Sequence, residues 1–204
     1  MARIAEHVAG FPELAAHRVD RAALIAAALY HDAGWAVQFR RGELERVELL
    51  TRPVNEPQRE LAASLLEALP ANVLSEGSRI LAARAIRECN RKASQQVEAH
   101  ILAEATNLDD IGPQAVWATA RRHFAEAKGV DAMLEAWHRQ QEYHYWEARL
   151  KECFRYPASR RLARRRLEAV ERFMNDLRQC HRLEDIDELS AGPSPLRQVL
   201  ADRP

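Results

Sequence analysis

The chain has 204 residues, of which 47 % are hydrophobic, so a full core can be buried without disulfides or a structural metal. Thirty basic residues balance 30 acidic ones, so the formal net charge is zero and no global attraction to nucleic acid or to an anionic membrane is expected. The longest apolar run, from Ala22 to Tyr30, is too short to span a bilayer. The start of the chain shows no signal-peptide pattern, and its three cysteines form no CxxC pair. These features predict a soluble cytoplasmic protein with reduced thiols and no membrane partner.

Composition also predicts the fold class. Alanine, leucine, glutamate and arginine dominate, only seven residues are glycine, and no strand-like alternation of useful length occurs. The chain is therefore predicted to be all-α, with at least seven helices and no sheet. Residues 36–57 are predicted as a loop with a short helical piece over 43–50, and residues 191–204 as a frayed tail. Helices are predicted at residues 2–16 with a break near Gly10 and Pro12, and at 21–32, 58–69, 78–90, 98–108, 113–124, 130–155 and 159–183.

The segment from Arg21 to Asp32 carries the strongest helical signal. Asp20 precedes it as the predicted N-cap, because a carboxylate accepts hydrogen bonds from the first unpaired N–H groups of a helix. Almost every residue before Tyr30 is apolar, which is typical of a helix buried at the centre of a domain. Gly34 is predicted to mark the end of this helix.

A His-Asp pair, His31 and Asp32, stands at the end of this apolar segment. Burial of an ionisable pair is costly unless a metal ion or hydrogen bonds compensate for it. A neutral imidazole nitrogen and a carboxylate oxygen together suit a divalent transition metal. The alternative interpretation is that the two residues only end a helix whose dipole favours a histidine there.

Three blocks of sequence follow one another in a characteristic order. Residues 22–35 read AALIAAALYHDAGW. Residues 99–112 resemble the pattern E-A-x-I-L-x-D-A-D-x-L-D-x-x-G, and residues 118–124 resemble its following A-R-x-F ending. Residues 149–174 contain an L-K pair and an F-M pair and resemble an element that has A-x-x-L-A-x-x-R between them. Together they resemble the HD-domain superfamily of metal-dependent phosphohydrolases. The resemblance implies a single HD-type helical domain, with residues 1–128 as the HD-like core and residues 129–190 as a C-terminal helical extension packed on it.

The resemblance also implies a set of metal ligands: an upstream histidine, the His-Asp pair and a distant aspartate. His31 and Asp32 match the pair. His7, 24 residues before His31, is the nearest candidate for the upstream histidine. The distant aspartate aligns with Thr106, whose hydroxyl is a poorer ligand than a carboxylate but should still share a pocket with the pair.

Other carboxylates near Thr106 offer partial substitutes. Glu104 aligns with an aspartate that is not a ligand in the family, and Asp109 lies one helical turn after Thr106, nearer to its face. At residues 88–90, where members with two metals often carry a histidine, the chain has Glu88, Cys89 and Asn90. The resemblance therefore implies at most one divalent metal ion, of the group Mn, Fe, Ni, Zn or Mg.

Two functions are compatible with these residues. The first is a metal-dependent phosphohydrolase of phosphate esters such as nucleotides, with Asp32 as the catalytic residue that orients water; without the aspartate at position 106, hydrolysis should be weak or absent. The second is a degenerate HD domain that binds a small phosphorylated molecule or a partner without catalysis. A homodimer is compatible with either function.

Two further patterns have both a functional and a structural interpretation. The arginines within residues 160–166 are able to grip phosphate, but the solvated face of a long helix is the favoured interpretation. The aromatic side chains between Trp137 and Trp146 are able to stack on a base, but core packing or a dimer contact is favoured. Nucleic acid is therefore not an expected partner.

Overall fold

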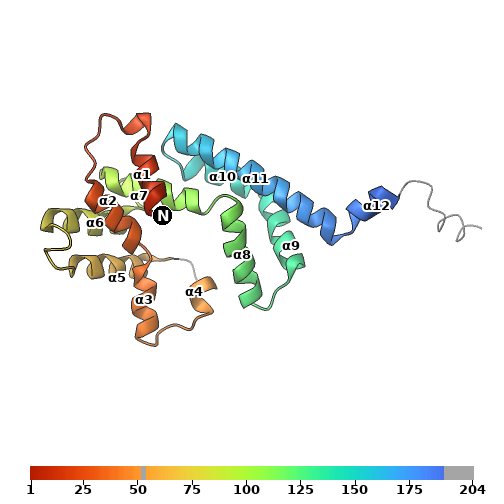
Figure 1. Cartoon of the computed structure of the whole chain (residues 1–204), viewed down its shortest axis with the longest axis horizontal. Coiled ribbons are helices and arrows are strands. Elements are labelled where there is room, and N and C mark those ends of the chain that lie inside the picture. The colour runs from red at the N-terminus through yellow and green to blue at the C-terminus, as the bar shows by residue number, and fades with distance from the viewer. Residues whose placement is uncertain (52–53, 191–204) are drawn as a thin grey trace, which may run out of the picture.

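The computed structural model describes residues 1–51 and 54–190, and every regular element in these ranges is helical (Figure 1). The all-α prediction is thus confirmed, whereas the tail over 191–204, predicted to be frayed, lies outside the described residues. No helix in the described ranges combines the length and the apolar character needed to cross a membrane. The elements are α1 (Ala2–Ala9), η1 (Pro12–Leu14), α2 (Arg21–Tyr30), α3 (Ala33–Arg40), α4 (Glu48–Thr51), α5 (Glu56–Glu67), α6 (Glu76–Glu88), α7 (Val97–Asp109), α8 (Pro113–Ala125), α9 (Val130–Glu142), α10 (Tyr145–Glu152), α11 (Pro157–His181) and α12 (Glu184–Ser190).

Helix α2 is central to the N-terminal part of the fold, where it packs against α1, α5, α6 and α7. Its N-terminus is capped as predicted, because Asp20 Oδ1 accepts the N–H of Ala23 over 3.0 Å. The other oxygen of Asp20 accepts the hydroxyl of Ser78 over 2.8 Å and so joins α2 to α6. Ala23 and Ala27 are fully buried, since their small side chains let neighbouring helices approach closely. Leu29, however, is 66 % exposed, so the prediction of a central helix that is buried all round is confirmed only in part.

Three predicted boundaries are wrong. Residues 36–40, predicted as the start of a loop, belong to helix α3. The helix predicted to begin at Ser78 begins earlier, because Ser75 is the cap and its hydroxyl oxygen accepts the N–H of Ser78 over 3.2 Å. The predicted helix over 130–155 is divided into α9 and α10 at His144, whose left-handed backbone, with φ of 51°, interrupts the helical path.

Gly34 lies inside α3 and does not end a helix. Helix α3 packs against α5, and a Cβ atom at Gly34 would lie 2.1 Å from the backbone oxygen of Gln58. The side chain of Gln58 donates from Nε2 to Gln38 Oε1 over 2.7 Å, which joins the same two helices. The glycine is therefore required by the close approach of two backbones and not by a turn.

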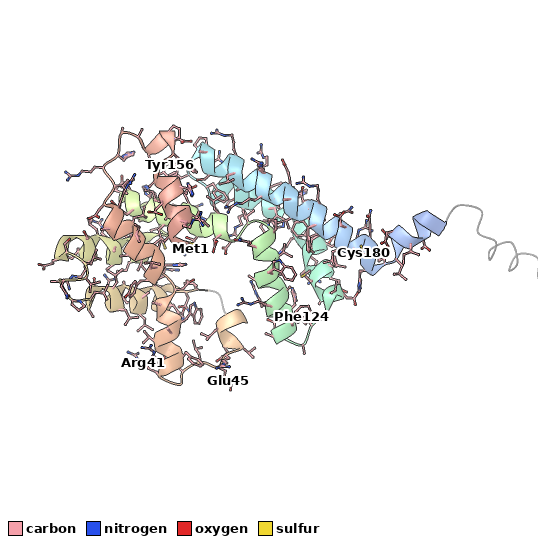
Figure 2. The ribbon with its side chains drawn as sticks, in the orientation of Figure 1. Met1, Arg41, Glu45, Phe124, Tyr156 and Cys180 are labelled. Atoms are coloured by element: carbon pink, nitrogen blue, oxygen red, sulfur yellow. The ribbon has the colours of Figure 1, made fainter. Side chains whose placement is uncertain are left out.

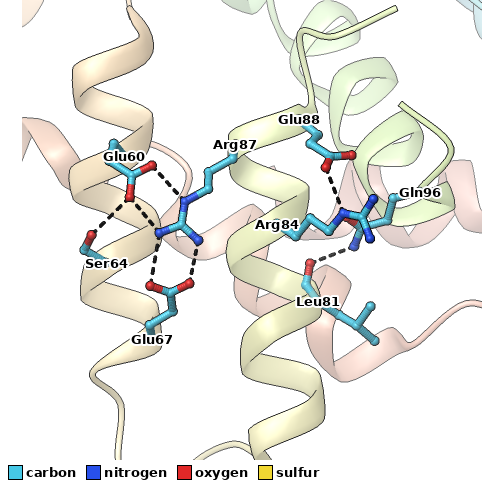
Figure 3. Close-up of polar contacts among 8 residues, drawn as sticks. All are labelled: Glu60, Ser64, Glu67, Leu81, Arg84, Arg87, Glu88 and Gln96. Carbon is cyan, nitrogen blue, oxygen red and sulfur yellow. Dashed lines mark hydrogen bonds and ion pairs between the residues drawn. The ribbon is translucent and has the colours of Figure 1, made fainter. Parts of the chain in front are cut away.

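Ion pairs join α5 to α6 on the outer surface of the molecule (Figure 3). Arg87 of α6 donates to both Glu60 and Glu67 of α5, with 2.7 Å to Glu60. These hydrogen bonds hold the pKa values of both carboxyl groups below their usual range. Helix α5 is thus joined to α6 by these ion pairs and to α3 by the hydrogen bond of Gln58.

The buried apolar residues form two separate clusters. The larger one is built mainly from α1, α2, α5, α6 and α7. The smaller one joins α8, α9 and α11, so packing links the segments on both sides of residue 128; its buried members are Val116, Ala120, Met133, Val170 and Met174. Helix α8 leads away from the larger cluster and carries Phe124, 61 % exposed, in its last turn (Figures 1 and 2).

Candidate functional site

His31 and Asp32 form the short connection between α2 and α3: His31 is the C-cap residue of α2, and Asp32 is the N-cap residue of α3. His31 Nδ1 lies 2.9 Å from the backbone oxygen of Ala28, and Nε2 lies 3.0 Å from Asp32 Oδ2. The carbonyl can only accept a hydrogen bond, so Nδ1 carries a proton, and Nε2 faces the carboxylate. Both ring nitrogens of His31 are therefore engaged within the chain itself.

The charge of His31 follows from these contacts. Burial has the largest effect and lowers the pKa of the imidazole, because only 15 % of the side chain is exposed. The hydrogen bond and the negative charge of Asp32, together with the Ala28 carbonyl, outweigh burial, so the pKa of His31 is raised above its ordinary value. The contacts with Asp32 and Ala28 therefore favour the protonated form of the His31 imidazole, beside the carboxyl group of Asp32.

Thr106 lies on α7 and lines the same cavity as His31 and Asp32. Position 106 thus lines the same cavity as the pair, whereas the prediction that it lies within about 7 Å of His31 or Asp32 stays a prediction. Its hydroxyl donates to the backbone oxygen of Leu102 over 2.5 Å, a contact within its own helix. Asp109, one turn further along α7, lines the cavity as well. Helix α7 thus presents a hydroxyl and a carboxylate to the space beside the His-Asp pair.

His7, the candidate upstream ligand, is not brought to the pair. It lies in the last turn of α1, is exposed, and is not part of the cavity wall. Across residues 1–51 and 54–190, no group of three or more His, Cys, Asp or Glu side chains is arranged to hold a metal ion. The structure thus joins two of the three predicted ligands, His31 and Asp32, and places the third elsewhere.

The donor set does not fit a divalent metal ion in the way the family resemblance implies. Catalytic zinc sites, for example, use three protein ligands, whereas the side chains here supply two, and those two bind each other at 3.0 Å. Thr106 offers a neutral hydroxyl whose proton is already donated to Leu102. We therefore derive no reaction step through a metal ion.

The cavity beside the pair has a volume of about 1000 Å³, at the upper end of the range typical of ligand pockets. It lies where the ends of α2, α6 and α7 meet α5 and the helices α8–α11. Cys89 and Asn90, at the position where the family often has a histidine, also line it, and burial raises the pKa of the Cys89 thiol. Side chains from eight helices or their ends contribute to one space.

Three arginine side chains line this cavity, and the sequence did not reveal that they lie together. Arg59, Arg122 and Arg149 line it, from α5, α8 and α10. Arg149 is paired with Asp110 at 2.7 Å, and although burial lowers its pKa, this bond and Tyr145 raise the net value. No local pattern marks these arginines among the 27 of the chain, because their convergence depends on tertiary packing.

Arg59 and Arg122 differ from Arg149. Within the described part of the chain, neither guanidinium forms an ion pair or a hydrogen bond, and Arg59 Nε is buried without an acceptor. Arg59 is partly buried, and a buried N–H group without an acceptor costs free energy that an anion in the cavity would recover, whereas Arg122 is exposed and offers an accessible positive charge. The two side chains are therefore candidates for contact with a negatively charged ligand.

The arginines of residues 160–166 have partly structural roles. Arg160 donates to the backbone oxygen of Phe154 over 2.8 Å, and Arg166 donates to that of Leu108 at the end of α7. Arg161, Arg164 and Arg165 are exposed. This arrangement agrees with the favoured interpretation of a solvated helix that also binds its neighbours.

Glu104, two residues before Thr106, faces away from the cavity. It is 2 % exposed, and its Oε1 accepts the N–H of Arg155 in the connection that leads into α11. Oε2 is buried beside the hydroxyl of Ser159, which is itself buried, and no hydrogen bond of good geometry joins them. Burial, only partly offset by Ser159 and the backbone N–H groups, raises the pKa of Glu104. The carboxyl thus joins α7 to α11 and takes no part in the site.

We expect Glu104→Gln to stabilise the protein near neutral pH. A carboxyl whose folded pKa is raised above the model value of 4.5 weakens the folded state as pH rises from about 4.5 through the folded pKa. The amide keeps the oxygen that accepts from Arg155 and adds a donor for Ser159. Unfolding by urea at several pH values should show a gain for the variant that is absent at pH 4 and grows above it.

Glu60→Gln provides the control of opposite sign. Arg87 lowers the pKa of Glu60, so this carboxylate contributes stability above about pH 4.5, and the variant should lose stability there. If both variants change stability in the same direction as pH rises, the account of Glu104 is wrong.

In comparisons with known proteins, no family model, no curated protein and no solved structure matches this chain. The resemblance to the HD-domain superfamily therefore stays a prediction from the sequence.

Proposed function

We propose that the chain is a helical domain that binds a small phosphorylated molecule in the cavity beside His31 and Asp32, without hydrolysing it. The observation that carries the proposal is the unpaired guanidinium of Arg59, whose Nε is buried without an acceptor in the cavity wall. A phosphate group supplies both the negative charge and the acceptor oxygens that such a side chain lacks. Arg122, also without an ion-pair partner in the described residues, offers a second contact.

The absence of hydrolysis follows from the donor set. His31 and Asp32 bind each other, and Thr106 stands where the resemblance implies an aspartate. His7 is exposed on α1 and is not part of the cavity wall. Without a third strong ligand, a divalent cation is held weakly, and the chemistry that it would supply is weakened with it.

The phosphohydrolase implied by the resemblance remains a second proposal, for which one contact argues. His31 Nδ1 donates to the Ala28 carbonyl, an arrangement that is common for histidines that bind metals and that leaves Nε2, now beside Asp32, as the nitrogen able to bind one. Brisk turnover of nucleotides or of p-nitrophenyl phosphate with manganese, iron, nickel or zinc, abolished by His31→Ala, would overturn the non-catalytic proposal.

We expect Arg59→Gln to weaken binding of butyl phosphate by about 10-fold or more, because a charge-assisted hydrogen bond contributes about 1.5–3 kcal/mol. Isothermal titration calorimetry on the full chain measures this directly. Arg121→Gln is the matched control, since it removes the same charge beside Arg122 but at an exposed residue outside the cavity wall. Equal losses in the two variants would mean that only the general charge of the surface matters.

A further inference from the structure

The cavity reaches beyond the His-Asp pair into the space between the two hydrophobic clusters. From the smaller cluster it is lined by Val116, Met133, Val170 and Met174, which belong to α8, α9 and α11. From the larger cluster it is lined by Ile111 and Leu167, among others. A single cavity thus has a wall of aliphatic and thioether side chains that the proposed phosphate contact does not use.

The opposite wall is polar. His31, Asp32, Arg59 and Asn90 come from the ends of α2 and α6 and from α5, which lie across the molecule from α9 and α11 (Figure 1). The side formed by α8, α9 and α11 also carries Arg122 and Gln140, but its buried members are the apolar side chains of the smaller cluster, so the two sides differ in their balance of polar and apolar groups. Such a division suits a ligand that has a charged group at one end and an apolar body at the other.

The volume supports this division. The space of about 1000 Å³, which is partly open to solvent, is far more than a phosphate group fills. Two methionines, Met133 and Met174, stand in the apolar wall, and methionine side chains adapt readily to the shape of a bound group. The apolar part of the cavity is thus suited to a flexible ligand.

The aromatic side chains do not form a slot for a planar ring. Trp137 and Trp146 both line the cavity, but their rings are packed against each other, with centroids 5.7 Å apart and planes inclined by 42°. Tyr145 meets Trp146 edge-on at 5.0 Å. The indole rings thus pack in part against neighbouring aromatic side chains, and the adaptable part of the wall is provided by aliphatic and thioether side chains.

We infer that the ligand is an amphiphile, with a phosphate group at Arg59 and an aliphatic chain between α8, α9 and α11. This inference rests on the proposed function, since it assigns the second half of the same binding site. It predicts that affinity depends on the length of the chain as well as on the charge.

The test uses the full chain and a series of ethyl, butyl, hexyl and octyl phosphates, each below its micelle-forming concentration, with calorimetry as the readout. Transfer of a methylene group from water into an apolar wall should tighten binding about three- to fourfold per added methylene from butyl to octyl phosphate. Arg59→Gln should weaken every member by the same factor and leave the dependence on length unchanged.

Ala136→Phe tests the apolar wall. Ala136 of α9 lines the cavity and is partly buried, so a phenyl ring there should fill the space and remove the gain between butyl and octyl phosphate. Ala132→Phe is the matched control, because Ala132 is equally half-buried on the same helix but is not part of the wall. It should keep the dependence on chain length.

A second readout does not depend on Ala136→Phe folding. The terminal bromine of 8-bromooctyl phosphate should quench tryptophan fluorescence, and Trp137→Phe should reduce this quenching. Trp117→Phe should not, since Trp117 is 68 % exposed and lies outside the cavity wall.

The outcomes separate the two proposals. Equal affinity for butyl and octyl phosphate, lost in Arg59→Gln, overturns the amphiphile and leaves the phosphate site in place. A dependence on length that is the same in Ala136→Phe, with quenching that Trp137→Phe does not reduce, means adsorption elsewhere and also overturns it. Binding of no member of the series overturns both proposals.

Discussion

Gly34→Ala is expected to destabilise the protein by at least about 3 kcal/mol, the upper range for overpacking in a core. The added Cβ would lie 2.1 Å from the backbone oxygen of Gln58, and a backbone atom cannot rotate away as the end of a side chain can. Helices α3 and α5 must therefore separate, which also breaks the contact of Gln58 with Gln38. Thermal unfolding followed by circular dichroism should show a midpoint lower by at least about 6 °C.

Gly77→Ala is the control for this prediction. Gly77 is also helical, in the first turn of α6, but nothing lies within 4 Å of the position that its Cβ would take. Alanine has the higher helix propensity, so this variant should gain up to about 1 kcal/mol. If Gly34→Ala is as stable as Gly77→Ala, the two helices do not approach as described.

Thr106→Asp is expected to tighten the binding of Ni²⁺ or Mn²⁺ by at least about 10-fold. The substitution adds a carboxylate to the cavity wall that already holds His31 and Asp32, and even changes outside the first coordination sphere typically alter metal affinity by about 10–100-fold. Calorimetry on protein freed of metal by a chelator measures the effect, and elemental analysis after dialysis measures occupancy.

Thr119→Asp is the matched control, because Thr119 lines the same cavity from α8 and the variant adds the same charge. Equal gains in both variants would indicate attraction to a more negative cavity and not a ligand at position 106. No gain in Thr106→Asp would show that the missing upstream histidine, for which His7 is not positioned, limits the site as much as the missing aspartate does.

The local features of the chain could be predicted because they depend on short-range interactions. Asp20 caps α2 through a hydrogen bond to a residue three positions away, and the apolar run that follows identifies the central helix. Pro113 and Pro157 stand in the first turns of α8 and α11, where a missing N–H is harmless. Such signals need no knowledge of what packs on a helix.

Parts of the candidate site were also accessible from the sequence. The resemblance of residues 99–112 to a family signature implied that Thr106 shares a pocket with His31 and Asp32, and all three line one cavity. The same reasoning placed Glu104 two residues away from the ligand position, and the structure puts this carboxyl at the α7–α11 junction. Opposite faces of one helix separate the two residues, which the helical period already requires.

Composition, capping residues and apolar periodicity by themselves determined the helical class, the apolar helix α2 and the place of the His-Asp pair at its end. Tertiary structure alone decided that Gly34 is a contact point of two backbones, that His7 lies apart from the pair, and that Arg59 and Arg149, 90 positions apart, line one cavity. The reason is that a hydrogen bond or a helical face joins residues within a few positions, whereas a cavity is bounded by whichever surfaces remain when distant helices pack. Those surfaces are set by volume and shape across the whole fold, and no local stretch of sequence contains them.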